Sequence, residues 1–273
     1  MLSDDMRVYY EAGREQTRLT RGVSIEFTRT QELIVRHAPP VPAVIYDIGG
    51  GSGPYAFWLA DLGYSVHLRD KMPLHIEQAQ ELMASHHALG SLAVGDARHV
   101  DLPGESAHMV LLLGPLYHLT EREDRIQALH ETYRLLRPGG VLLAAGISRY
   151  ASVLDGMNRG YLDDPVFREI VQTDLATGQH RNSANHPGYF TTAYFHQPAE
   201  LWQEAQDAGF DNTTLYAIEG PLWLAQAAQE RWDDLGLREH YLEAVRWIEC
   251  DPALIAVSSH LLVVGRKSAH KGL

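Results

Sequence analysis

The chain has 273 residues, of which 45% are hydrophobic and 21% are charged, a composition typical of a folded globular protein. Its formal net charge of −12 argues against a nucleic-acid partner, because such proteins neutralise phosphates with clustered Lys and Arg. A single cysteine, Cys250, excludes an intramolecular disulfide, and no stretch reaches the roughly 18 apolar residues of a membrane span. We therefore expect a cytoplasmic protein with no membrane partner, and nothing in the sequence indicates an oligomeric state.

Residues 1–40 carry apolar side chains at helical spacing and end in a proline-rich stretch, which predicts one or two helices before the core. Beyond them, short apolar runs alternate with helical segments. The predicted strands are 43–46, 64–68, 92–94, 108–113 and 141–147, and the predicted helices between them are 55–62, 74–86 and 122–136. This alternation predicts an α/β fold with a doubly wound, mostly parallel sheet.

Residues 150–190 interrupt the alternation and are rich in Gly, Asp, Asn and Tyr, so we interpret them as an insertion over the carboxyl edge of the sheet. The later predicted elements are a helix at 198–208, a strand at 213–218, helical residues at 221–249 and a strand at 261–264. We expect the two late strands to pair antiparallel. The predicted organisation is a single domain, 1–273, with amino-terminal helices (1–40), a core (41–149), an insertion region (150–195) and a carboxy-terminal part (196–273).

The turn after the first predicted strand reads Asp47-Ile48-Gly49-Gly50-Gly51-Ser52-Gly53. In α/β folds the helix after this turn begins with free N–H groups, and glycines let a ligand approach the backbone. Asp70 ends the second strand 19 residues after Gly51, where a carboxylate can accept both hydroxyls of a ribose. These features predict a nucleoside cofactor. They leave its identity open, because residues 51–56 also fit the loose dinucleotide pattern.

Three further features favour S-adenosylmethionine. Asp47 precedes the glycines at the end of the first predicted strand, where its charge would repel a pyrophosphate and attract an amino-acid ammonium group. Asp96, after the third predicted strand, offers a carboxylate that could accept from an adenine amino group. The stretch 137–140, Arg-Pro-Gly-Gly, precedes the fifth predicted strand.

With these motifs, residues 44–147 resemble the Rossmann-like, or class I, S-adenosylmethionine-dependent methyltransferases, whose Asp-x-Gly-x-Gly-x-Gly turn is matched in full. The resemblance implies a seven-stranded sheet with an antiparallel last strand. It also implies that Gly49 and Gly51 pack against the methionine moiety, that Asp70 holds the ribose, and that Asp96 and Ala97 flank adenine. The predicted cofactor-binding residues are Asp47, Gly49, Gly50, Gly51, Gly53, Asp70, Lys71, Asp96, Ala97, Leu113, Tyr10 and Arg29.

Methyl transfer is an in-line displacement on a sulfonium, so the leaving group needs no acid and the enzyme chiefly positions the reactants. Only a nucleophile that still carries a proton needs a base. His118 is the predicted base, with Tyr117 beside it, because this segment follows the fourth predicted strand at the carboxyl edge. The alternative is that His118 caps the next helix or bonds a backbone carbonyl.

The amino-terminal helices of related enzymes often fold over the cofactor as a lid. On that reading Arg29 or Arg14 could pair with the methionine carboxylate, while Tyr10 contacts the cofactor and Tyr9 the methyl acceptor. Tyr194 and His196 are further predicted substrate-binding residues after the insertion. Packing of the tyrosines and solvation of the arginines are the simpler alternatives.

We expect no metal, because none of the close histidine pairs has the helical spacing of a zinc site.

The main prediction from the sequence is a methyltransferase for a small-molecule acceptor. A nicotinamide oxidoreductase is one alternative, opposed by Asp47 and by the absence of a Tyr-x-x-x-Lys motif. The others keep the cofactor: attack at another of its carbons, giving methylthioadenosine, or binding without turnover, as a sensor or scaffold.

Overall fold

The structure, a computed structural model, describes residues 25–183, 186 and 188–269. These residues form two compact units. Unit 1 comprises 25–30, 146–201 and 215–262, and unit 2 comprises 31–145, 202–214 and 263–269. Five elements run from one unit into the other: α2 (Ile25–His37), β5 (Leu136–Ser148), α9 (Pro198–Asp207), β8 (Asp211–Ala217) and β9 (His260–Arg266).

Unit 2 contains the parallel sheet. Its strands are β1 (Val44–Ile48), β2 (Ser65–Asp70), β3 (Ser91–Val94), β4 (Ala107–Leu112) and the first part of β5, in the order β3-β2-β1-β4-β5. Neighbouring strands in this row are parallel. Asp47, near the end of β1, lies opposite Leu68 of β2 and Leu111 of β4. The predicted parallel α/β sheet is confirmed.

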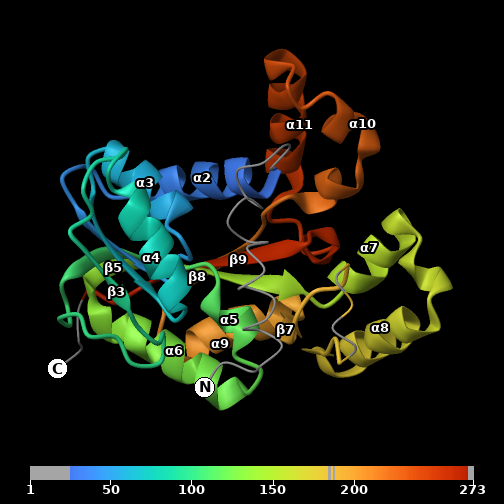
Figure 1. Ribbon diagram of the computed structural model, residues 1–273, viewed down its shortest axis with the longest axis horizontal. Coiled ribbons are helices and arrows are strands. Elements are labelled where there is room, and N and C mark those ends of the chain that lie inside the picture. The colour runs from blue at the N-terminus through green and yellow to red at the C-terminus, as the bar shows by residue number, and fades with distance from the viewer. Residues whose placement is uncertain (1–24, 184–185, 187, 270–273) are drawn as a thin grey trace. The chain divides into compact units, whose positions relative to one another are not determined.

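Four helices connect these strands: α3 (Pro54–Asp61), α4 (Pro73–Leu82), α5 (Pro115–His118) and α6 (Arg122–Leu135). The chain moves from β1 outward to β3 and later from β4 to β5 in the opposite direction. Because crossovers between parallel strands are right-handed, α3 and α4 cover one face and α6 the other, as Figure 1 shows. The central strands are buried on both faces, with side chains such as Ile45, Leu68 and Met109 at 0% exposure, which explains their continuous apolar runs.

The last strand runs antiparallel to its neighbours. In unit 2, Gly139 N donates to Lys267 O (2.9 Å), and in unit 1, Ser148 N donates to Ser259 O (2.9 Å), so β5 and β9 run in opposite directions. In unit 1, Ile218 N, just after β8, donates to His260 O (3.1 Å) at the start of β9. The predicted pairing of the two late strands with an antiparallel last strand is therefore confirmed.

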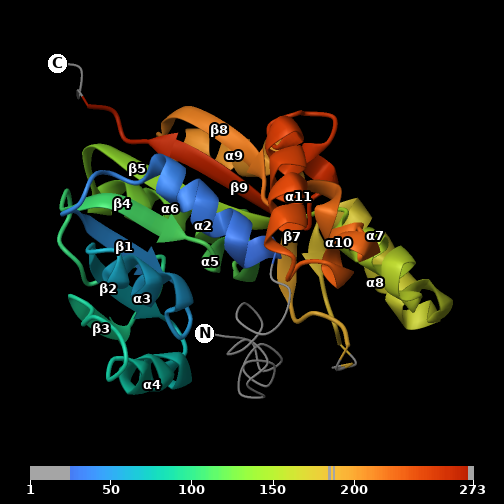
Figure 2. The same cartoon turned by 90° about the horizontal axis from the view of Figure 1, so that it is seen from above.

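The insertion in unit 1 contains elements that the sequence analysis did not predict: α7 (Ala151–Arg159), η1 (Tyr161–Asp163), α8 (Pro165–Thr177), β6 (Gln179–His180) and β7 (Ala193–His196). Strand β7 pairs with β6 antiparallel and with the end of β5 in parallel. Helices α7 and α8 lie side by side in both views (Figures 1 and 2). They enclose a small core of Phe167, Ile170, Val171 and Tyr189.

The predicted helical stretch 221–249 is divided in the structure. It consists of η2 (Gly220–Leu224), α10 (Gln226–Glu230) and α11 (Leu235–Ile248), followed by η3 (Ile255–Val257). The Asp234 carboxylate starts α11 by accepting from the backbone N–H groups of Gly236 (3.0 Å) and Leu237 (3.2 Å). Ile25 of α2, Leu222 and Trp232 belong to one buried cluster in this part of unit 1.

Candidate active site

The glycine-rich turn after β1 has a backbone that only glycine adopts easily. Gly49, Gly51 and Gly53 have φ values of 73°, 60° and 88°. A Cβ on Gly49 would also lie 2.4 Å from Cγ of Pro115, so the turn and the segment after β4 are in close contact. Gly53 directly precedes α3, which begins with Pro54. The turn therefore presents bare backbone at the carboxyl end of β1.

Asp47 is fully buried beside this turn. Neither of its carboxylate oxygens has a hydrogen-bond partner among the residues that the structure describes. Burial, and then the charge of nearby Asp70, raise the pKa of Asp47 to about 7. A buried carboxylate without a donor is costly, and a cationic ligand would relieve that cost. The ammonium group of a methionine moiety meets this requirement.

Asp70 links the end of β2 to the glycine turn. Its carboxylate accepts from the backbone N–H of Gly51 (2.9 Å), from that of Met72 (2.8 Å), and bonds Nδ1 of His75 (2.9 Å). A carboxylate has about four acceptor positions, so one remains for a ribose hydroxyl. The sequence analysis missed His75. Its place in the first turn of α4, five residues after Asp70, was the only available signal.

Asp96 is held by two cations. Its carboxylate accepts from Arg98, through the side chain (2.7 and 3.0 Å) and backbone N–H (3.0 Å), and from Nζ of Lys71 (2.9 Å). These bonds, those from Arg98 foremost, hold the pKa of Asp96 well below its usual range. All four acceptor positions are therefore engaged, so an adenine amino group would have to compete with Lys71. Ala97, next to Asp96, is half-buried.

The segment after β4 carries Leu113, Tyr117 and His118, all half-buried. Its single helical turn, α5, is anchored by Leu116, which is 0% exposed. The Tyr117 and His118 rings meet edge to face, with centroids 4.6 Å apart. A Cβ on Gly114 would lie 2.9 Å from the carbonyl oxygen of Gly49. Unit 2 thus brings the segment of His118 against the glycine-rich turn.

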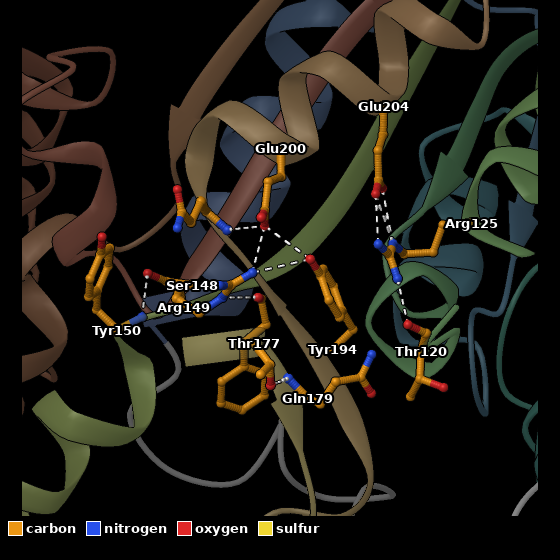
Figure 3. Close-up of polar contacts among 12 residues, drawn as sticks. Thr120, Arg125, Ser148, Arg149, Tyr150, Thr177, Gln179, Tyr194, Glu200 and Glu204 are labelled. Atoms are coloured by element: carbon orange, nitrogen blue, oxygen red, sulfur yellow. Dashed lines mark hydrogen bonds and ion pairs between the residues drawn. The ribbon is translucent and has the colours of Figure 1, made fainter. Parts of the chain in front are cut away.

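Three further predicted residues, Tyr194, His196 and Arg29, belong to unit 1, where protein groups surround them. Tyr194 donates its hydroxyl to Glu200 (3.2 Å), and Arg149 bonds both side chains (3.1 and 2.7 Å; Figure 3). His196 is fully buried. Arg29 is 0% exposed and binds Glu249 and the carbonyl oxygen of Ile218.

These contacts assign no ligand to the unit 1 residues. The substrate roles of Tyr194 and His196 and the cofactor role of Arg29 stay predictions. Tyr9, Tyr10 and Arg14 lie outside the described residues.

One cluster in unit 1 bears on the expectation of no metal. Within the described part of the chain, Glu26, Glu219 and His260 each place one ligand atom within 4.8 Å of the others. Both oxygens of Glu219 already accept hydrogen bonds: Oε2 from Ser258 Oγ (2.9 Å) and from His260 N (3.0 Å), and Oε1 from Nδ1 of His260 (2.5 Å). The expectation of no metal stays a prediction.

Among the residues that the structure describes, no helix is both long and apolar enough to cross a bilayer.

Comparison with known proteins agrees with this geometry. Residues 45–140 match the family model described as a methyltransferase domain. One similar solved structure is an S-adenosylmethionine-dependent methyltransferase from Thermotoga maritima, described as a possible histamine N-methyltransferase. It is 15% identical in sequence with a TM-score of 0.57, and the match covers 97% of this chain and 99% of that chain. A search of curated proteins found no match.

Two further structures share the fold. Phosphoethanolamine N-methyltransferase 2 of Haemonchus contortus, in complex with phosphomonomethylethanolamine and S-adenosylhomocysteine, is 17% identical with a TM-score of 0.55, covering 88% of this chain and 52% of that chain. A chain from the complex of the Haloferax volcanii Trm112 activator with a putative methyltransferase is 18% identical with a TM-score of 0.59, covering 100% of both chains. Residues 45–140 are thus similar to a methyltransferase domain, and the chain shares the fold of solved S-adenosylmethionine-dependent methyltransferases.

Proposed function

We propose that this protein transfers the methyl group of S-adenosylmethionine to a small-molecule acceptor and releases S-adenosylhomocysteine. The observation that carries the cofactor part is Asp47, a fully buried carboxylate with no donor among the described residues, placed beside a turn of positive-φ glycines. A nicotinamide dinucleotide would bring its pyrophosphate to this carboxylate, so the oxidoreductase alternative is disfavoured.

Each cofactor-binding residue has a defined task in this proposal. Asp47 holds the ammonium group, and Gly49 to Gly51, with Gly53, admit the methionine moiety to the backbone. Asp70, fixed by His75, holds the ribose. Lys71, Asp96, Ala97 and Leu113 surround the adenine. The bound cofactor supplies an electrophilic methyl group on a positively charged sulfur.

Tyr117 and His118 act on the methyl acceptor. Their segment packs against Gly49, so it lies beside the methionine end of the proposed cofactor site. His118 takes a proton from an acceptor that loses one, a role for which a histidine side chain is suited. The half-buried position of both rings limits the access of water.

Two observations support a small molecule as acceptor. The net charge of −12 opposes binding of a nucleic acid. Two proteins of the same fold are described by small substrates, one as a possible histamine N-methyltransferase and one with bound phosphomonomethylethanolamine.

The test is turnover of methyl-labelled S-adenosylmethionine by the full-length protein with a panel of small amines, phenols, thiols and carbon acids. We expect label in one acceptor class and S-adenosylhomocysteine as the cofactor product, with loss of both in Asp47→Asn. Methylthioadenosine as the product would contradict methyl transfer. Label that enters only added RNA or protein would contradict a small-molecule acceptor.

A further inference from the structure

Arg125 of α6 is an unusually enclosed charge in unit 2. Its side chain is 2% exposed, and that of Glu204 of α9, its ion-pair partner, is 3% exposed. Arg125 Nε donates to both Glu204 oxygens (3.1 Å each), and Nη2 donates to Oε1 (2.8 Å), in the forked arrangement shown in Figure 3. The guanidinium is thereby held in one orientation.

The remaining nitrogen of this fork reaches the backbone after α5. Arg125 Nη1 donates to the carbonyl oxygens of Leu119 (2.9 Å) and Thr120 (3.0 Å). These carbonyls lie between α5 and α6, outside both helices. A buried ion pair is weak support for stability, because desolvation of the charges offsets much of their attraction. The clearest effect of the Arg125–Glu204 pair is that it fixes the position of the backbone at residues 119–120.

The other end of the same segment touches the cofactor turn. Pro115 packs so closely on Gly49 that a Cβ there would overlap it, and Gly114 lies against the Gly49 carbonyl. Residues 114–120 are thus held at one end by the turn and at the other by Arg125. Tyr117 and His118 lie between these two supports.

We propose that Arg125 and Glu204 are a positioning pair for methyl transfer, which sets the place of Tyr117 and His118 relative to the cofactor turn. This inference rests on the proposed function for its catalytic consequence. Arg125 itself touches no reactant in this account and acts through the backbone of residues 119–120. A displacement of about 1 Å in such a segment can cost about 100-fold in rate without abolishing binding.

The same helix offers a matched control in Arg134. Arg134 also bonds a glutamate, Glu131 (2.7 and 2.8 Å), and two loop carbonyls, those of Val100 (3.0 Å) and Leu102 (3.1 Å). Its loop leads into the start of β4, at the amino edge of the sheet. Arg134 therefore makes the same kinds of contact away from the proposed site.

The experiment compares Arg125→Lys, Glu204→Gln and Arg134→Lys in the full-length protein. Lysine keeps the charge but cannot donate to a carboxylate and two carbonyls in a fixed fork. Hydrogen exchange is measured for peptides covering 114–120 and 100–106, S-adenosylhomocysteine binding by calorimetry, and turnover with the acceptor that the panel identifies.

We expect Arg125→Lys and Glu204→Gln to speed exchange in 114–120 about tenfold and to lower kcat at least tenfold. The dissociation constant of S-adenosylhomocysteine should stay within threefold. Arg134→Lys should speed exchange only in 100–106 and leave kcat unchanged. Unchanged exchange in 114–120, or equal loss of kcat in Arg134→Lys, would overturn the proposal. Should wild-type protein not bind S-adenosylhomocysteine, the proposed function fails, while the exchange comparison still decides whether the pair positions the segment.

Discussion

At the scale of single residues, Asp47 has the most unusual environment in the proposed cofactor site. Its burial and its proximity to Asp70 raise its pKa to about 7, so near neutral pH it is partly protonated in the free protein. A ligand ammonium group favours the ionised carboxylate. Cofactor binding and proton release are therefore coupled.

We predict that affinity for S-adenosylhomocysteine falls as the pH drops below 7. If binding requires the fully ionised carboxylate, the affinity falls roughly eightfold when the pH is lowered from 7.5 to 6, because the ligand must then displace a proton from Asp47. Calorimetry in two buffers of different ionisation enthalpy should detect the released proton at pH 6 and much less proton release at pH 8, where Asp47 is already mostly ionised. Asp61→Asn, which changes an aspartate at the exposed end of α3, should keep this dependence. Equal affinity at both pH values would contradict the coupling.

The same carboxylate should make the free protein less stable at high pH. Its pKa is near 3.8 in the unfolded chain and about 7 in the folded one, so the folded state binds more protons between these values. Stability from this group is complete below pH 4 and is lost as pH rises to 7. Asp47→Asn should therefore raise the unfolding free energy at pH 8 by on the order of 2 to 4 kcal/mol and change it little at pH 4. Denaturation of both proteins at the two pH values checks this. A less stable variant at pH 8 would contradict it.

Sequence reasoning singled out Asp47, Asp70 and His118 because each lies at or after the carboxyl end of a buried strand, where parallel sheets bind ligands. It did not find His75, Arg98 or the Arg125–Glu204 pair. The members of that pair are 79 residues apart, and only the packing of α6 near α9 in unit 2 makes them partners. Nothing in their local pattern distinguishes them from solvated charges.

At the scale of elements, the glycine turn depends on both its backbone conformation and its closeness to Pro115. Gly49 combines a positive φ with a site that has no room for a side chain. Gly139 has a similar φ of 77°, with nothing within 4 Å of the position of an added Cβ. Substitutions at these two glycines therefore distinguish the effect of backbone strain alone from that of strain combined with a steric clash.

Gly139→Ala should cost about 1 kcal/mol of stability, the usual penalty for a left-handed alanine, and leave cofactor binding unchanged. Gly49→Ala should cost more and weaken S-adenosylhomocysteine binding at least tenfold, because the turn and Pro115 must move apart. Denaturation and calorimetry on both variants test this. Equal effects on binding would show that the contact with Pro115 does not shape the site.

The elements that sequence analysis predicted best are the parallel strands, whose apolar runs and glycine-rich ends are local signals. It missed α7 and α8 in the insertion. A sufficient signal for α8 was present: Asp164 caps the helix by accepting from Val166 N (2.8 Å), Pro165 begins it, and Gly178 with φ 76° ends it. For α7, Gly156 inside the helix and the polar residues Asp155 and Asn158 beside it weakened the helical signal.

At the scale of the whole molecule, the proposed cofactor site belongs entirely to unit 2, whereas most residues predicted to bind the methyl acceptor belong to unit 1 or lie outside the described residues. The cofactor motif was predictable because it is confined to consecutive strand ends. The predicted acceptor-binding residues Tyr9, Tyr194 and His196 come from the amino-terminal segment and from the end of the insertion, whose sequences carry no comparable motif.

The most direct test of the central claim is calorimetric titration of the full-length protein with S-adenosylhomocysteine and, separately, with NAD. We predict saturable binding of S-adenosylhomocysteine, no heat with NAD, and at least a 100-fold loss of S-adenosylhomocysteine affinity in Asp47→Asn at pH 8, since a buried charge pair is worth several kcal/mol. Binding of NAD alone, or unchanged affinity in Asp47→Asn, would contradict the assignment of this site to the methionine end of the cofactor.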